Sequence, residues 1–309
     1  MDKIELETKS DAIDAALWKH RINTRVTGGT VTPRAVVFNV TESLTLPEKL
    51  AAELSGDLAQ ALDVADVTLT GKTITMLRAD ACPVKLLHLL GRLTGLAAKP
   101  LPPCTAALGL CDDGVPLLMR LPSKDVGHVL VTGPDGCGKS SLLRTMAVSL
   151  ALCNRPRDLR LVMVGRSFSD MARLPHVMSY AHNNWQARKA LGDVVHRLGR
   201  GDHAPRVVVM IDGLADVNCN GNLARLLKDG HAAGVHLVAS GEVSSASFGT
   251  LIHGKDEPGY FEVVSKGEEI RFTAASITPA EVNQVVIGAM PKPEPTRLHR
   301  AAAVLTGAN

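Results

Sequence analysis

The feature that most constrains this chain is a glycine-rich segment at residues 133–140, which reads Gly-Pro-Asp-Gly-Cys-Gly-Lys-Ser. The apolar run at 128–132 before it predicts a buried strand, and residues 141–150 after it predict a helix. A strand, a glycine loop and a helix in this order form the context in which this pattern holds phosphate. Glycines let the backbone wrap an anion, and the N–H groups of the loop and of the helix N-terminus point toward it.

The segment therefore predicts a site for ATP and Mg²⁺. Lys139 is expected to reach the outer phosphates as a catalytic point charge, and the Ser140 hydroxyl is expected to bind the magnesium ion. The residues expected to contact the nucleotide are Gly133, Pro134, Asp135, Gly136, Cys137, Gly138, Lys139, Ser140 and Ser141.

A second expected element of the site is the apolar run at 206–212, which predicts a buried strand ending in Asp212. An aspartate at the tip of a strand beside the phosphate loop can hold magnesium through its water shell. Asp212 is therefore predicted as both a metal-binding and a catalytic residue.

The residue after this aspartate is Gly213, where most ATPases of this kind place a glutamate. A glycine cannot accept a proton, and general-base assistance is worth about 10²–10⁴ in rate, so slow hydrolysis is expected. Asp216 and Glu242 are the alternatives for the missing carboxylate. We favour Glu242 as the catalytic substitute, because it follows a predicted strand at 235–240 whose tip faces the same crevice.

Composition sets broad limits on the partners. The chain has 309 residues, enough for about two domains, and its net charge of +3 neither establishes nor excludes a nucleic-acid partner. Aromatic residues make up 3%, so base stacking on aromatic platforms is not expected. The six cysteines lack metal-ligand spacing. Neither a signal peptide nor an apolar run of about 18 residues is evident, which predicts a cytoplasmic protein without a membrane span.

The order of predicted elements indicates two folding units. The expected division is a small α+β domain at 1–98, a proline-rich linker at 99–107, a P-loop ATPase domain at 108–290 and a C-terminal tail at 291–309. Strand-like runs at 159–164, 206–212 and 235–240 alternate with helix-like segments at 185–198 and 222–233. This alternation predicts the α/β class, with a P-loop (RecA-like) parallel sheet covered by helices on both faces.

Several further segments resemble the FtsK/SpoIIIE family of DNA-pumping ATPases, within the wider FtsK–HerA group. The approach to the loop is similar at Ala107–Gly109, Gly114–Leu117 and Gly127–Val131. The Leu-Pro-His-Val segment at 174–177, the strand and turn at 209–216 and the Ala-Ala-Gly-Val-His-Leu-Val segment at 232–238 also resemble that family. Residues 34–93 resemble in element order the small domain that precedes the family's motor core.

The resemblance implies a homo-oligomeric, hexameric ring that binds ATP at subunit interfaces and pumps double-stranded DNA through its channel. The chain departs from the family in three places. Gly213 replaces the catalytic glutamate, Glu242 stands where the family has a glutamine, and the arginine-rich segment after that strand is shortened to about 243–258. Two alternatives therefore remain open: a nucleotide-binding scaffold or switch with weak or no ATPase activity, and a pump for protein substrates as in type VII secretion.

Other conspicuous side chains are expected to have structural or surface roles. We expect His176 to make a structural hydrogen bond, His236 to be satisfied in the core and Trp185 to anchor its helix. The basic residues Arg144, Arg166, Arg173 and Lys228 are considered as contacts for DNA phosphates, with a solvated surface charge as the favoured reading of each.

Overall fold

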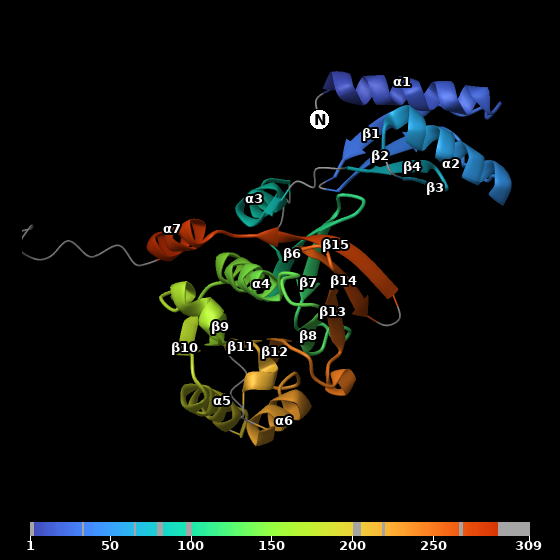
Figure 1. The fold of residues 1–309 in the computed structure, drawn as a ribbon. Coiled ribbons are helices and arrows are strands. Elements are labelled where there is room, and N and C mark those ends of the chain that lie inside the picture. Colours follow the sequence, from blue (N-terminus) through green and yellow to red (C-terminus); the bar gives the residue numbers. More distant parts are fainter. Residues whose placement is uncertain are drawn as a thin grey trace, which may run out of the picture.

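Two sheets organise the chain in the computed structural model, which describes residues 3–32, 34–64, 66–78, 83–96, 101–199, 205–217, 220–265 and 268–289. The first sheet has four strands in the order β1-β2-β4-β3, and the second is a larger mixed sheet (Figure 1). The predicted tail at 291–309 lies outside the described residues.

The small sheet packs against two helices. Its elements are α1 (Lys3–Lys19), β1 (Val26–Val31), β2 (Ala35–Val40), α2 (Glu48–Leu62), β3 (Val67–Thr70) and β4 (Thr73–Leu77). The apolar faces of α1 and α2 bury Leu17 and Leu58 against Phe38, all at 1% exposure or less. An α+β unit with its own core is thus confirmed at the N-terminal end of the chain.

The segment after this unit packs on the larger sheet. Strand β5 (Val84–Lys85) pairs with β15 (Glu268–Ser276), and α3 (Leu86–Leu96) buries Leu86 and Leu89 in the core of that sheet. Strand β6 (Thr105–Cys111) begins within the predicted linker and also joins the larger sheet. The domain boundary near residue 98 stays a prediction, and these contacts tie residues 84–96 to the second core.

The larger sheet runs in the order β10-β9-β11-β12-β8-β13-β14-β15-β6-β7. Its other strands are β7 (Pro116–Arg120), β8 (Val129–Thr132), β9 (Leu159–Val164), β10 (Val177–Ala181), β11 (Arg206–Asp212), β12 (Val235–Ser240), β13 (Thr250–Gly254) and β14 (Tyr260–Ser265). The neighbouring pairs from β10 to β13 are parallel, and the pairs from β13 to β7 are antiparallel. The predicted parallel sheet is therefore confirmed as one half of a mixed sheet.

Helices cover both faces of the parallel half, as the near-continuous apolar strands predict. On one face lie α4 (Lys139–Cys153), η1 (Arg166–Met171) and α7 (Pro279–Ala289), and on the other lie α5 (Asn184–Gly199) and α6 (Asn220–Asp229). Short 3₁₀ turns η2 (Leu214–Asp216) and η3 (Ser245–Ser247) follow β11 and β12. Successive residues of β11 point to opposite faces of the sheet. Met210 lies in one core and Ile211 in the other, and both side chains have 0% exposure.

Candidate functional site

The phosphate loop connects the end of β8 to the start of α4, as the sequence predicts. Gly133, Gly136 and Gly138 have φ angles of 130°, 84° and 105°, which side chains of L-residues rarely adopt. A Cβ at Gly133 would lie 2.7 Å from the carbonyl oxygen of Gly254, in the neighbouring strand β13. Glycine is thus required at this position by both the backbone angle and the close approach of a second chain segment.

The backbone N–H groups of the loop suit an anion. Among the described residues, no acceptor pairs with the N–H groups of Gly136, Gly138, Lys139 or Ser140. The groups of Lys139 and Ser140 also belong to the first turn of α4, where a helix has unpaired donors and a positive dipole end. The space beside Gly136 is open, because a Cβ there would meet no atom within 4 Å. The loop therefore fits the phosphate groups of a nucleotide.

Lys139 lies across the mouth of this loop. Its Nζ donates to the carbonyl oxygens of Gly133, at 2.6 Å, and Pro134, at 2.9 Å. The carboxylate of Asp135 lies 3.5 Å from the same nitrogen. The ammonium group is thus held beside the unpaired N–H groups, where its charge adds to the attraction for phosphate.

Asp212 lies at the tip of β11, with β12 between it and the strand that leads into the loop. The register places Asp212 beside Ser240, and Ser240 beside Val131 of β8. With neighbouring strands ~4.8 Å apart, the Cα atoms of Asp212 and Val131 are separated by roughly 10 Å. Asp212 is thus two strands away from the strand that leads into the loop, with β12 between them.

A short hydrogen-bond chain orients the Asp212 carboxylate. Ser240 Oγ donates to Asp212 Oδ1 at 2.6 Å, and the backbone N–H of Gly213 donates to Ser240 Oγ at 3.0 Å. Gly165 packs closely on Asp212, since a Cβ at Gly165 would lie 2.9 Å from Asp212 Cβ. Ser240 was not recognised from the sequence, although its place at the end of an apolar strand beside the Asp212 strand is a usable signal.

Gly213 adopts a left-handed backbone with φ 86° and ψ 64°. An L-residue pays roughly 1–2 kcal/mol in this region, so a glutamate here would be strained. The backbone of the turn after β11 therefore favours the glycine found at position 213 over a glutamate.

Of the two candidate replacements for the missing glutamate, the structure describes the side chain of Glu242 but not that of Asp216. Glu242 lies just after β12 and is exposed, and the neighbouring Gly241 N–H donates to the Val131 carbonyl oxygen at 3.1 Å. This bond holds the turn that carries Glu242 against the strand leading into the loop. The side chain of Asp216 lies outside the described residues. A catalytic role for Glu242 stays a prediction.

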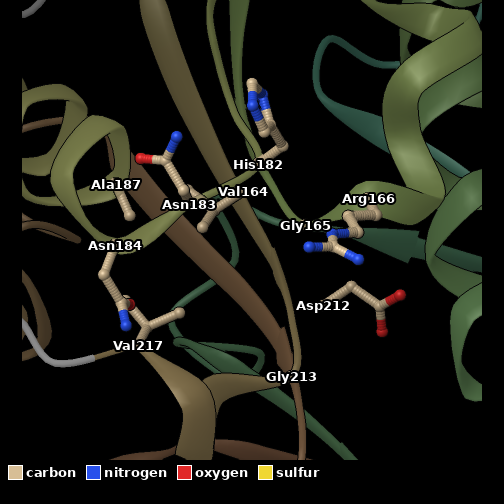
Figure 2. A pocket seen from close by; sticks show the side chains of 10 residues that line it. All are labelled: Val164, Gly165, Arg166, His182, Asn183, Asn184, Ala187, Asp212, Gly213 and Val217. Carbon is tan, nitrogen blue, oxygen red and sulfur yellow. The ribbon is translucent and has the colours of Figure 1, made fainter.

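A polar pocket of about 340 Å³ opens at the carboxyl ends of β9, β10 and β11. Figure 2 shows Arg166 and Asp212 together on one side of it, with Asn183 and Asn184 on the opposite side. These residues are far apart in the sequence, but each lies at or just after the end of a buried strand. Polar residues at strand ends of such sheets often form binding crevices, and this is the signal that could have connected them.

The basic residues considered as DNA contacts differ in their surroundings. Arg144 donates two hydrogen bonds of 2.6 Å each to the carboxylate of Asp170, so its charge is engaged inside the fold. Arg166, Arg173 and Lys228 are exposed. The structure thus leaves these three as candidates for contacts with an external anion.

The expected roles of two further side chains need correction. Trp185 does not anchor α5 by burial, because its exposure is 72%. His236 is buried at 1% exposure, but neither ring nitrogen has a hydrogen-bond partner among the described residues, so it is not satisfied. The structural hydrogen bond expected of His176 is present, between Nε2 and the Asn154 carbonyl oxygen at 2.9 Å.

Two features are absent from the described residues. No cluster of His, Cys, Asp and Glu there could hold a metal ion by protein ligands alone. None of the helices that the structure describes is long and apolar enough to cross a membrane.

Two curated proteins with related sequences are named DNA translocases. The chain is 23% identical to DNA translocase SftA of Bacillus subtilis, over 77% of this chain and 29% of the relative. It is 28% identical to DNA translocase FtsK of Helicobacter pylori, over 60% of this chain and 26% of the relative. The aligned part thus spans less than a third of the length of either relative.

Two solved structures share the fold. The cytoplasmic domain of the type VII secretion ATPase EccC from Thermomonospora curvata aligns with a TM-score of 0.55 at 20% identity, covering 70% of this chain and 36% of that one. The pCW3 conjugation coupling protein TcpA, in its monomer form with ATPγS, aligns with a TM-score of 0.53 at 13% identity, covering 91% and 99%. The FtsK/SpoIIIE family model matches residues 98–202, which contain the whole phosphate loop. Residues 98–202 are thus similar to the FtsK/SpoIIIE family, and the fold around them is shared with these two ATPase structures.

Proposed function

We propose that the chain binds ATP with Mg²⁺ at the loop after β8 and uses its hydrolysis to move double-stranded DNA. The observation that carries the proposal is the set of unpaired N–H groups at Gly136, Gly138, Lys139 and Ser140, with the Lys139 ammonium beside them. Such a cradle recognises a polyphosphate chain and has little to offer an uncharged ligand.

In this proposal each residue has a separate task. The loop N–H groups and Lys139 bind and orient the phosphates, and the Ser140 hydroxyl and the Asp212 carboxylate hold the metal, Asp212 through water. Magnesium, when bound, neutralises charge on the outer phosphate oxygens. Ser240 keeps the Asp212 carboxylate directed to that place through its 2.6 Å hydrogen bond.

The chain has no glutamate directly after Asp212 to accept a proton from the attacking water. Gly213 has no side chain, and we propose that the exposed Glu242 orients the attacking water in its place. Without such a substitute the reaction would lose about 10²–10⁴ in rate and turnover would be slow. Glu242→Gln should lower single-turnover hydrolysis while leaving ATP affinity unchanged.

The DNA substrate and the ring assembly are proposed from the relatives, which are named DNA translocases. Exposed cations such as Arg166 and Lys228 support contact with phosphate backbones. Binding of this kind weakens steeply with salt, because each phosphate contact releases counterions. Electron microscopy with duplex DNA and a non-hydrolysable ATP analogue should show a ring of copies around the duplex.

Single-turnover ATP hydrolysis, with and without duplex DNA, tests the function. We expect DNA to stimulate turnover. Lys139→Ala should abolish it, because the variant loses the charge that orients the outer phosphates and also binds ATP at least ~10-fold more weakly. Arg25→Ala, which removes an exposed charge in the small N-terminal unit, serves as the control and should match the wild type. Tight ATP binding without turnover would instead favour a nucleotide-dependent switch, and hydrolysis stimulated only by a polypeptide would favour a protein pump.

A further inference from the structure

A cavity of about 370 Å³ lies beside the phosphate loop, on the side away from Asp212. Three parts of the chain enclose it. One is the loop with the first turn of α4, the second is the β13–β14 turn with strands β14 and β15, and the third is Arg34 with Pro83. The residues that line it include Gly136, Gly138, Ser141, Leu142, Glu257 and Phe261.

The order of strands sets the direction of a bound nucleotide. Asp212 lies on β11, on one side of β8, and the strands β13, β14 and β15 follow on the other side. If the terminal phosphate lies toward Asp212 and its metal, the nucleoside points toward β14 and β15. The cavity lies at this end of the loop, and its volume falls in the range of small-molecule sites, ~300–1,000 Å³.

Arg34 reaches this cavity from the small N-terminal unit. Its guanidinium carbon lies 3.6 Å from the centroid of the Tyr260 ring, and its Nη2 lies 2.5 Å from Glu257 Oε2. The side chain is only 17% exposed. A guanidinium carries five donors in a rigid fork, and the ion pair with Glu257 uses the nitrogen Nη2. Arg34 is thus a fixed, charged group at the wall of the cavity.

The segment that Arg34 holds also touches the phosphate loop. In the β13–β14 turn, the Gly259 N–H donates to the Cys137 carbonyl oxygen at 2.9 Å. Tyr260, next to this glycine, donates its hydroxyl hydrogen to Asp112 Oδ2 at 2.8 Å. The Tyr260 ring, on which Arg34 stacks, is thereby also held at its hydroxyl end.

We infer that this cavity receives the nucleoside half of the bound nucleotide and that Arg34 is a nucleotide-binding residue contributed by the small N-terminal unit. The inference rests on the proposed binding of ATP at residues 133–140. Arg34 donates hydrogen bonds to the ribose or to the edge of the base, at a wall behind which Leu142 and Phe261 are fully buried. Nucleotide binding thereby connects the small sheet to the ATPase core.

The test compares two probes that share phosphates but differ in the nucleoside. Isothermal titration calorimetry with Mg²⁺ would measure the affinity for ATP and for inorganic tripolyphosphate. Arg34→Ala should weaken ATP binding roughly three- to tenfold, and it should leave tripolyphosphate binding unchanged. Arg34→Lys, which keeps the charge and loses the planar fork, should restore part of the ATP affinity and also serves if the alanine variant fails to fold.

The matched control is Arg25→Ala, an exposed arginine in the same unit, which should bind both probes like the wild type. Equal weakening of ATP and tripolyphosphate by both Arg34 variants would overturn the inference, because Arg34 would then act only on the shape of the loop. Unchanged ATP affinity in both variants would overturn it as well. A wild-type protein that binds neither probe would instead contradict the proposed function, and the inference with it.

Discussion

Acid should destabilise this protein through His236, in the middle of the sheet. The side chain lies in β12 at 1% exposure, and neither ring nitrogen has a partner among the described residues. Burial, with the nearby charges of His231, His128 and Arg206 as further causes, lowers the pKa of His236 from 6.5 to about 3. The fold therefore accommodates the neutral ring and resists protonation.

The sign and size of the effect follow from linkage. The folded-state pKa is depressed, so the contribution to stability is fully present above pH 6.5 and is lost as the pH falls toward 3. Between pH 7.5 and 5, the unfolded chain protonates this histidine while the folded chain does not. At about 1.4 kcal/mol per pH unit below the unfolded pKa, the loss of unfolding free energy is about 2 kcal/mol.

Urea unfolding of the wild type and of His236→Leu at several pH values between 7.5 and 5 measures this quantity. The leucine variant is apolar and of similar size, so it should unfold with a pH dependence smaller by about 2 kcal/mol over this range. Burial also lowers the pKa of His128 and of His176, so a residual dependence of the same sign should remain. His182→Gln, at an exposed position, should keep the wild-type dependence. Equal pH dependence in the wild type and His236→Leu would refute the reasoning.

Three further substitutions probe the site and its support. Asp212→Asn keeps the shape but removes the charge, so ATP turnover should fall sharply while the melting temperature stays close to that of the wild type, and unchanged turnover would exclude the metal role. Arg144→Ala should lower the unfolding free energy by about 2 kcal/mol in denaturant titrations, because it leaves the Asp170 carboxylate half-buried without its bidentate partner. Gly213→Glu should destabilise the protein by roughly 1–2 kcal/mol and fail to accelerate hydrolysis, because φ is 86° at this position. A fast and stable glutamate variant would show that the turn adapts.

Part of the fold was predictable because it depends on local patterns. The strands β8, β9, β11 and β12 have apolar runs that predict buried strands, and each lies within a residue or two of its expected bounds. The helix α1 begins at Lys3, and its first turns are charged and lack the apolar periodicity that would predict a helix there. Strand β1 was missed, since its Thr-Gly-Gly-Thr centre has little strand propensity. It pairs with β2 in antiparallel fashion, and a Cβ at Gly29 would lie 3.2 Å from the ring of Phe38 on β2.

The antiparallel half of the larger sheet was harder to predict. Strands β13, β14 and β15 carry mixed polar and apolar residues, and β15 pairs with β6, which lies more than a hundred residues earlier in the chain. The periodicity of apolar residues within one segment cannot predict which distant strand that segment pairs with. Trp185 shows the same limit, because an aromatic residue at the start of a helix suggests an anchor until the fold shows which face is covered.

The phosphate loop can be predicted from the amino-acid order, since the glycines, Lys139 and Ser140 lie within eight consecutive positions and their geometry is set by neighbouring bonds. The absence of a glutamate after Asp212 can be predicted in the same way, because Gly213 is its neighbour in the chain. In contrast, the hydrogen bond by which Ser240 orients Asp212 and the place of Arg34 at the wall of the cavity depend on the three-dimensional fold. These contacts join residues far apart in the chain, and their distances depend on how whole strands pair and how the small sheet packs on the large one.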